Sequence, residues 1–168
     1  MDRKSSAGFA RTAVTLLLIT GVLLGAVAAW GADKPAPDFT LPDILNGKDF
    51  TLSQFKGKVV MLNFFTFFCG PCREEMPYLN QIYNEYKGKG LQTFGIGLAS
   101  DPTQLRFLVK QLGLEYPVLM GNDKVSAAYG NVEVVPTTII IDRQGNVVQK
   151  ILGSRKKEEF IKAIQPLL

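Results

Sequence analysis

The sequence contains no histidine, and only two of its 168 residues are cysteine. The missing imidazole excludes histidine general-base catalysis, haem ligation through histidine and most zinc or copper sites. Two cysteines alone rarely hold a metal ion, so we expect no metal and no bound cofactor. The net charge of +4 is mild and forms no long basic run, which argues against a nucleic-acid partner.

Both cysteines lie in one short segment, Cys69-Gly70-Pro71-Cys72. An apolar run over residues 59–65 precedes the segment and predicts a buried strand, while a helical spacing of apolar residues follows it. The pair therefore belongs at a turn from strand to helix. A disulfide that closes so short a loop adds little stability, which favours redox chemistry over a structural bridge.

The two cysteines are expected to have unequal roles. Cys69 would lie at the helix N-terminus, with Pro71 in the first turn, where its missing N–H is not needed. Free backbone N–H groups and the helix dipole then favour its thiolate, the species that attacks a disulfide. Cys72 lies one turn later on the apolar stripe and would resolve the mixed disulfide, so the pair would alternate between dithiol and redox-active disulfide.

Glu75 is the third candidate catalytic residue, because it falls on the same apolar stripe as Cys72. Burial would raise the pKa of its carboxyl group, so that it could take the proton that Cys72 must lose. The alternative is that Glu74 and Glu75 both complement the positive end of the helix. For Glu74 this alternative is preferred, and for Glu75 both interpretations stay open.

The first 32 residues are typical of a secretory signal or an uncleaved membrane anchor. Three basic residues come first, and residues 12–30 are uncharged and largely apolar, about the length that spans a bilayer. Cleavage after Ala28 or near Gly31 and retention in the inner membrane are both open. Either outcome predicts that a domain comprising residues 33–168 functions in the periplasm or another extracytoplasmic space.

The rest of the sequence predicts one α/β domain. Apolar patterns indicate strands at 39–41, 50–52, 59–65, 91–98, 137–141 and 147–152, and a short extended piece at 116–119. Helices are expected over 72–86, 101–112 and 124–129, with a last amphipathic helix near the C-terminus. This order predicts a central mixed sheet with helices on both faces.

Two of these features together resemble the thioredoxin fold over roughly residues 35–168. They are the cysteine segment after a buried strand and Val135-Pro136-Thr137 before a later strand. The stretches 36–41 and 55–64 are similar to those of the extracytoplasmic TlpA/ResA-like thiol-disulfide oxidoreductases, which share this Redoxin-like opening with peroxiredoxins. The resemblance implies an N-terminal β extension and a helix–strand insert, which Asp101 to Met120 would supply.

The resemblance also implies a substrate-binding surface beside the cysteines. Val135-Pro136 would be cis, with the Val135 backbone pairing to a substrate, and Gly70, Pro71 and Phe68 would complete the surface. A glutamate at the position of Glu75 recurs in ResA-like proteins.

Three positions depart from the patterns of related proteins. Thioredoxin buries an aspartate at the position of Asn63, which cannot titrate. Phe65 and Phe68 stand where the family usually has tryptophan, so the substrate face is expected to differ.

These observations predict an exported enzyme that reduces disulfides in extracytoplasmic proteins. The family suggests an apocytochrome c as substrate and a membrane thiol carrier as electron donor. One alternative is a thiol peroxidase, since Thr66 precedes Cys69 as in peroxiredoxins, although Leu62 replaces the expected proline. The other is a binding or chaperone module whose cysteines are incidental.

Overall fold

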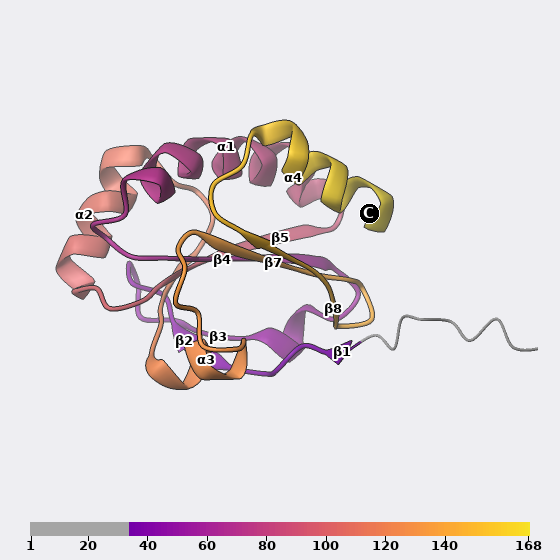
Figure 1. The fold of residues 1–168 in the computed structure, drawn as a ribbon, viewed down its shortest axis with the longest axis horizontal. Coiled ribbons are helices and arrows are strands. Elements are labelled where there is room, and N and C mark those ends of the chain that lie inside the picture. The colour runs from indigo at the N-terminus through magenta and orange to yellow at the C-terminus, as the bar shows by residue number, and fades with distance from the viewer. Residues whose placement is uncertain (1–33) are drawn as a thin grey trace, which may run out of the picture. The chain divides into compact units, whose positions relative to one another are not determined.

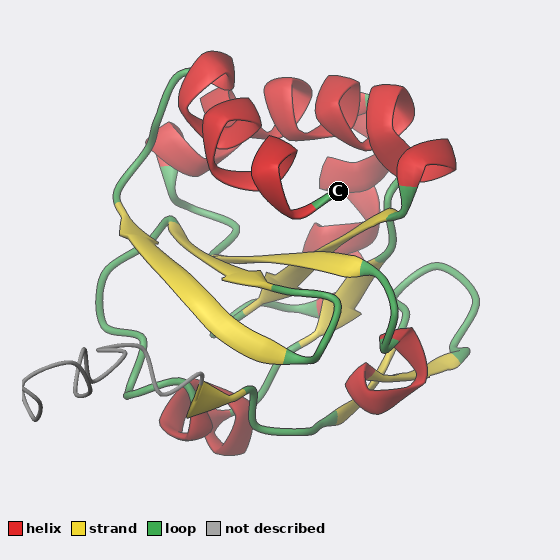
Figure 2. Cartoon of the chain, turned by 90° about the vertical axis from the view of Figure 1, so that its right-hand side faces the viewer, coloured by secondary structure: helices red, strands yellow, loops and turns green. Residues whose placement is uncertain are grey.

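The computed structural model describes residues 34–168, which form a sheet between two outer layers (Figures 1 and 2). Within this part of the chain, no helix is both long and apolar enough to cross a membrane. The predicted signal or anchor, residues 1–32, lies outside the described residues, and the domain boundary after it stays a prediction.

The element order follows the predicted one closely. The strands are β1 Lys34–Pro35, β2 Thr40–Pro42, β3 Asp49–Thr51, β4 Val59–Phe65, β5 Leu91–Gly97, β6 Val118–Met120, β7 Thr137–Ile141 and β8 Asn146–Leu152. The α-helices are α1 Gly70–Tyr86, α2 Pro102–Leu112, α3 Asp123–Ala128 and α4 Lys157–Ile164. Short 3-10 turns are η1 Leu52–Phe55, η2 Lys87–Lys89 and η3 Gln165–Leu167.

The central sheet has six strands in the order β1-β8-β7-β4-β5-β6. Strands β4, β5 and β6 run parallel, whereas β7 is antiparallel to both β4 and β8. The sheet is therefore mixed, as predicted. All seven residues of β4 are buried, which agrees with its continuous apolar run.

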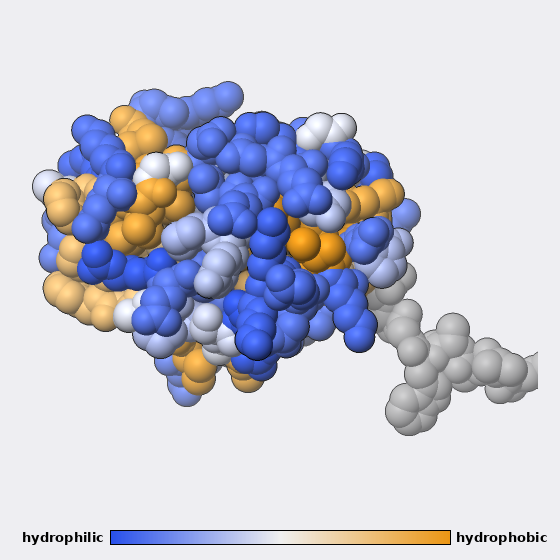
Figure 3. Space-filling view, turned by 90° about the horizontal axis from the view of Figure 1, so that it is seen from above, coloured by the Kyte–Doolittle hydropathy of each residue, from blue (hydrophilic) through white to orange (hydrophobic). Residues whose placement is uncertain are grey.

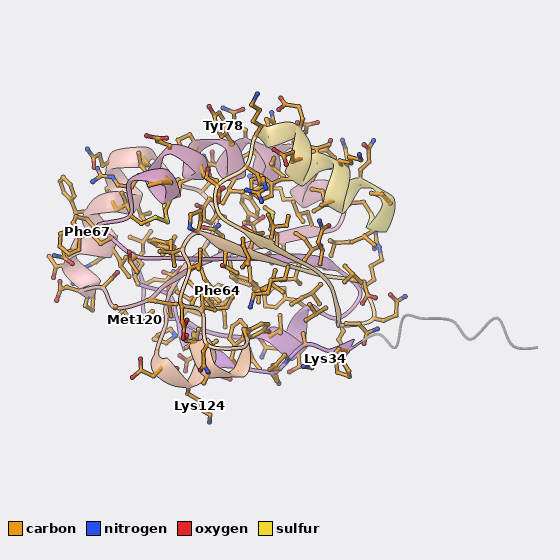
Figure 4. The ribbon with its side chains drawn as sticks, in the orientation of Figure 1. Lys34, Phe64, Phe67, Tyr78, Met120 and Lys124 are labelled. Carbon is orange, nitrogen blue, oxygen red and sulfur yellow. A yellow bond between two sulfur atoms is a disulfide. The ribbon has the colours of Figure 1, made fainter. Side chains whose placement is uncertain are left out.

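Alternate residues of β4 face two different cores, because side chains along a strand alternate between the faces of the sheet. Met61 and Phe65 pack in the core under α1, α2 and α4. Leu62 and Phe64 pack in the other core, which the β2–β3 hairpin, η1 and α3 cover. Figure 1 shows α1 and α4 above the sheet and α3 below it, and Figure 4 labels Phe64 on the lower side.

The predicted helix–strand insert is present between the cysteine segment and β7. Asp101 caps α2 with a reciprocal capping box, in which its carboxylate accepts from the backbone N–H of Gln104 and the Gln104 side chain accepts from the backbone N–H of Asp101. Gly113 ends the helix in the left-handed conformation, with φ of 60°. Strand β6 then adds to the edge of the sheet beside β5.

The N-terminal extension differs from its prediction in two details. Lys34 and Pro35 precede the first predicted strand, but they form β1 and pair antiparallel with β8. A proline fits there because an edge strand leaves one side of its backbone free of ladder hydrogen bonds. Leu52, predicted as the end of a strand, instead begins η1, and β2 and β3 form a separate two-stranded sheet.

Candidate active site

A disulfide joins Cys69 and Cys72 at the start of α1, with an S–S distance of 2.01 Å and a Cα–Cα distance of 5.3 Å. Cys69 is the N-cap of the helix, and its Sγ accepts a hydrogen bond of 3.2 Å from the backbone N–H of Cys72. The sulfur of Cys69 thus occupies the position of a helix-capping oxygen, where a negative charge is favoured.

The two sulfurs differ in exposure, as their helical positions predict. Cys72 is fully buried, whereas Cys69 is partly exposed, and Gly70 and Pro71 between them are exposed. Cys72 faces inward because it starts the buried stripe of α1, which continues through Glu75, Met76, Leu79, Ile82 and Tyr86. A substrate disulfide can therefore approach Cys69 and not Cys72.

Glu75 lies on the buried stripe one turn after Cys72, and 1% of its surface is exposed. Its Oε1 accepts a hydrogen bond of 2.9 Å from Asn63 Nδ2 on β4. Its Oε2 accepts a hydrogen bond of 2.9 Å from the backbone N–H of Arg155, in the segment between β8 and α4. Each carboxylate oxygen thus accepts at least one hydrogen bond, which is how a buried charge is retained.

Burial raises the pKa of Glu75 above its usual value of 4.5, because the charged form has lost its hydration. The Arg155 backbone N–H, the Ser154 hydroxyl and the Asn63 amide oppose this rise, and the Arg155 guanidinium adds a smaller opposing effect. Ser154 is exposed, and it borders a surface crevice with Glu74, Tyr78 and Lys156. The buried carboxylate therefore has a polar contact with a residue that reaches solvent.

The Val135–Pro136 peptide bond is cis. Pro136 is buried and Val135 is partly buried against the same core that holds Cys72. Thr137, the first residue of β7, pairs with Phe64 near the C-terminal end of β4. The cis peptide therefore lies at the same end of these two central strands as the cysteine segment, which follows β4. Within residues 34–168, the backbone N–H and C=O of Val135 make no hydrogen bond to another backbone group.

Two adjacent aromatic rings stand in front of the cysteines. Phe68 is 78% exposed and packs edge-on against Phe67, with 5.0 Å between the ring centres. The Arg73 guanidinium lies 5.9 Å from the centre of the Phe67 ring and donates a hydrogen bond of 3.0 Å to Gln111 on α2. The insert helix is therefore tied to the rim of the site.

Figure 4 places Phe67 at the edge of the molecule beside α2. In Figure 3, which looks down on the helical layer, hydrophobic residues gather toward that same end, and a second group lies toward the opposite end. An apolar rim beside a reactive sulfur suits contact with a protein chain.

Several residues of the site were not predicted from the sequence. Thr138, Ser154 and Arg155 contact Asn63 or Glu75, and Gln111 holds Arg73. All of them lie on distant segments and carry no motif that could have identified them. Asn63 was noticeable as the one polar residue of a buried strand, although its partners were not predictable.

No group of three metal-ligating side chains occurs among residues 34–168. A cavity of about 330 Å³ lies away from the cysteines, between η1 and the β7–β8 turn, and it shares no residue with the site; its lining includes Leu52, Phe55, Val60 and Ile141.

A thioredoxin fold with a cysteine pair at the strand-to-helix turn is the architecture of a thiol-disulfide oxidoreductase, and comparison with known proteins agrees. A family model described as Redoxin matches residues 31–164. The chain is similar to the thiol-disulfide oxidoreductase ResA of Bacillus anthracis, with 39% identity over 137 residues, which cover 79% of this chain and 78% of that protein. For ResA of Geobacillus kaustophilus the identity is 33%, covering 94% of each chain.

A solved structure supports the same assignment. The putative thiol:disulfide interchange protein DsbE from Chlorobium tepidum superposes with a TM-score of 0.74 and 33% identity, covering 80% of this chain and 96% of that chain. The chain belongs to the Redoxin family, as a ResA-type thiol-disulfide oxidoreductase. The predicted fold and enzyme class are thereby confirmed.

Proposed function

We propose that this protein is exported and reduces disulfides of extracytoplasmic proteins through Cys69 and Cys72. The unequal exposure of the two sulfurs is the observation that carries the proposal. The Cys69 thiolate attacks a substrate disulfide, forms a mixed disulfide and releases one substrate sulfur as a thiolate. Cys72 then attacks Cys69, which restores the internal disulfide and releases the second substrate thiolate, so two electrons pass to the substrate.

Glu75 supplies the proton acceptor for the second step. Cys72 must pass from thiol to thiolate before it attacks, and it is buried away from bulk water. The Glu75 carboxylate lies one helical turn away, and burial raises its pKa, which makes it a better base. The proton moves from Cys72 to Glu75 and later leaves toward the solvent-exposed Ser154.

The substrate binds as an extended segment across the rim of the site. The unpaired backbone groups of Val135 suit pairing with an extended chain, and the buried Pro136 keeps that segment in place. Gly70 and Pro71 leave space above Cys69 because both are exposed and neither carries a long side chain. Phe68 offers an apolar contact to the residues that flank the substrate disulfide.

The substrate we favour is an apocytochrome c whose haem-binding cysteines must be reduced, with a membrane thiol carrier as electron donor. The resemblance to ResA-like proteins supports this choice. The basic residues followed by the apolar segment 12–30 support export, with the N-terminus at the membrane at least transiently. Gly-Pro between the cysteines resembles the reducing thioredoxins and supports the reducing direction.

A trapping experiment tests the assignment of roles. In a Cys72→Ala variant, Cys69 should retain substrate and donor as mixed disulfides that mass spectrometry can identify. The matched Cys69→Ala variant should trap neither. Capture by both variants, or by Cys69→Ala alone, would overturn the roles.

A second measurement separates the reductase from the thiol peroxidase. The reduced protein should reduce insulin disulfides and consume hydrogen peroxide only slowly. Fast peroxide turnover without insulin reduction would reject the reductase function.

A further inference from the structure

Asn63 contains a buried polar atom that has no partner. The side chain is completely buried, and its Nδ2 donates to Glu75 Oε1 at 2.9 Å and to Thr138 Oγ1 at 3.0 Å. Its Oδ1 makes no hydrogen bond to any group in the described residues. An unpaired buried acceptor destabilises the folded state, so its presence beside a buried carboxylate calls for an explanation.

The hydrogen-bond partners of the Asn63 side chain explain why its NH₂ end faces Glu75. A carboxylate can only accept hydrogen bonds, so it requires the NH₂ end of Asn63. Once Glu75 holds a proton on Oε1, its O–H must donate, and the NH₂ group cannot accept it. A half-turn about χ2 exchanges the two ends of the amide and brings Oδ1 to the place of Nδ2.

Thr138 permits this exchange without losing a hydrogen bond. Its hydroxyl accepts from Nδ2 in the first orientation and can donate to Oδ1 in the second, because a hydroxyl both donates and accepts. Thr138 lies directly opposite Asn63 in the β4–β7 pairing, which keeps its hydroxyl at the amide in both states. Both orientations therefore make two hydrogen bonds, and either Oδ1 or Nδ2 remains unpaired.

We propose that Asn63 is a positioning residue whose amide turns over when Glu75 takes up a proton, so that Nδ2 holds the carboxylate and Oδ1 holds the acid. The inference rests on the proposed role of Glu75 as proton acceptor from Cys72. Asn63 would thus have a function although its side chain cannot gain or lose a proton. It would keep the Glu75 side chain in one position while the charge of Glu75 changes.

The other groups around Glu75 favour a proton on Oε1. The Arg155 backbone N–H can only donate, so Oε2 must continue to accept it. The Arg155 guanidinium interacts with Glu75 by charge, the Tyr116 phenol stays neutral because burial raises its pKa, and Cys72 precedes Glu75 on α1. The rival is a proton on Oε2 donated to the Ser154 hydroxyl, and in that case the Asn63 amide stays in place.

Nuclear magnetic resonance of the full-length oxidised protein, labelled with ¹³C and ¹⁵N, tests this inference. Above the titration of Glu75, scalar coupling across the hydrogen bond should connect Asn63 Nδ2 to the Glu75 carboxyl carbon. Below it the coupling should disappear, and the Asn63 amide resonances should shift with the same midpoint as the Glu75 carboxyl carbon. Gln92, whose buried side-chain amide donates to the Thr93 carbonyl, is the matched control and should not follow that midpoint.

A Glu75→Gln variant should hold the Asn63 amide in its second orientation, with Oδ1 toward residue 75. The Arg155 N–H requires the oxygen of the new amide, so its NH₂ group must face Asn63 and donate to Oδ1. Asn63 should then show its low-pH resonances at every pH. The inference would be overturned if the Asn63 resonances did not change as Glu75 titrates. It would also be overturned if they kept their high-pH positions in Glu75→Gln.

The two proposals about this site can fail separately. If Glu75→Gln reduces protein disulfides at the rate of the unaltered protein, the proton role fails, whatever Asn63 does. If that rate falls but the amide does not move, only the inference about Asn63 fails. As a functional readout, Asn63→Leu should shift the pH–rate profile to higher pH, because the carboxylate loses a donor, and an unchanged profile would count against the positioning role.

Discussion

Glu75 and Arg155 are 80 residues apart in the sequence, yet the backbone N–H of Arg155 donates directly to the buried carboxylate of Glu75 at 2.9 Å. The contact joins the second turn of α1 to the segment that leads into α4. It fixes one oxygen of the carboxylate and leaves the other for Asn63. The glutamate is therefore held between two distant parts of the chain, one helical turn from Cys72, the cysteine whose proton we propose it accepts.

Replacing Glu75 by glutamine should change how stability depends on pH. The folded-state pKa is raised, so the folded protein binds the proton more tightly than the unfolded chain, and stability falls as pH rises from the usual value of 4.5 through the raised one. Denaturant unfolding of the oxidised protein between pH 4 and 8 should show this fall. In Glu75→Gln the curve should be flatter, and the variant should gain relative stability toward pH 8. A parallel pair of curves would contradict the prediction.

The reduced cysteines should differ in their reaction with alkylating agents. Cys69 is partly exposed at the helix N-terminus and Cys72 is fully buried, so iodoacetamide should modify Cys69 at least about tenfold faster. Peptide mass spectrometry over a time course gives both rates. The Cys72→Ala variant provides the control, since its single thiol should react at the rate assigned to Cys69. Faster modification of Cys72 would mean that the roles are reversed.

Removing the Phe68 ring should weaken substrate binding and leave the fold intact. The ring is 78% exposed, so Phe68→Ala should change the unfolding free energy by no more than about 0.5 kcal/mol. The KM for a protein disulfide should rise while kcat stays nearly constant, because in our proposal the ring offers a contact to the substrate and takes no part in the exchange between sulfurs. Val148→Ala, at an exposed position on β8, is the control and should alter neither constant. An unchanged KM in Phe68→Ala would exclude the ring from the substrate surface.

Restoring the family tryptophans should have opposite consequences at the two phenylalanine positions. Phe65 is fully buried, and a Cβ added to the neighbouring Gly95 would lie only 3.2 Å from its ring, so little free volume surrounds it. Phe65→Trp should destabilise the protein by about 1–3 kcal/mol through overpacking. Phe68→Trp should stay within about 0.5 kcal/mol of the unaltered protein, since that ring faces solvent. Urea titrations of the two variants measure the difference, and equal stabilities would contradict it.

Local features of the sequence were sufficient for most of the fold. Both boundaries of β4 were predicted correctly, because a continuous apolar run is typical of a central strand that is buried on both faces, and the strand ends where the run ends. The stripe from Cys72 to Tyr86 follows from the helical repeat, which also explains why Cys72 faces inward. Strand β1 was missed because two residues, one of them proline, carry no periodic signal, and only the edge of β8 gives them a partner.

In the candidate site, too, some features could be predicted from the sequence and others could not. The positions and unequal exposure of Cys69 and Cys72, and the burial of Glu75, follow from short-range stereochemistry: a capped helix start and a repeat of 3.6 residues. The sequence alone determined these features, because they depend only on residues within a few turns of one another. The contacts of Glu75 with Arg155, of Asn63 with Thr138 and of Arg73 with Gln111 were decided by the tertiary structure. They join segments 38 to 80 residues apart, and only the packing of the whole sheet and its helices brings such segments together.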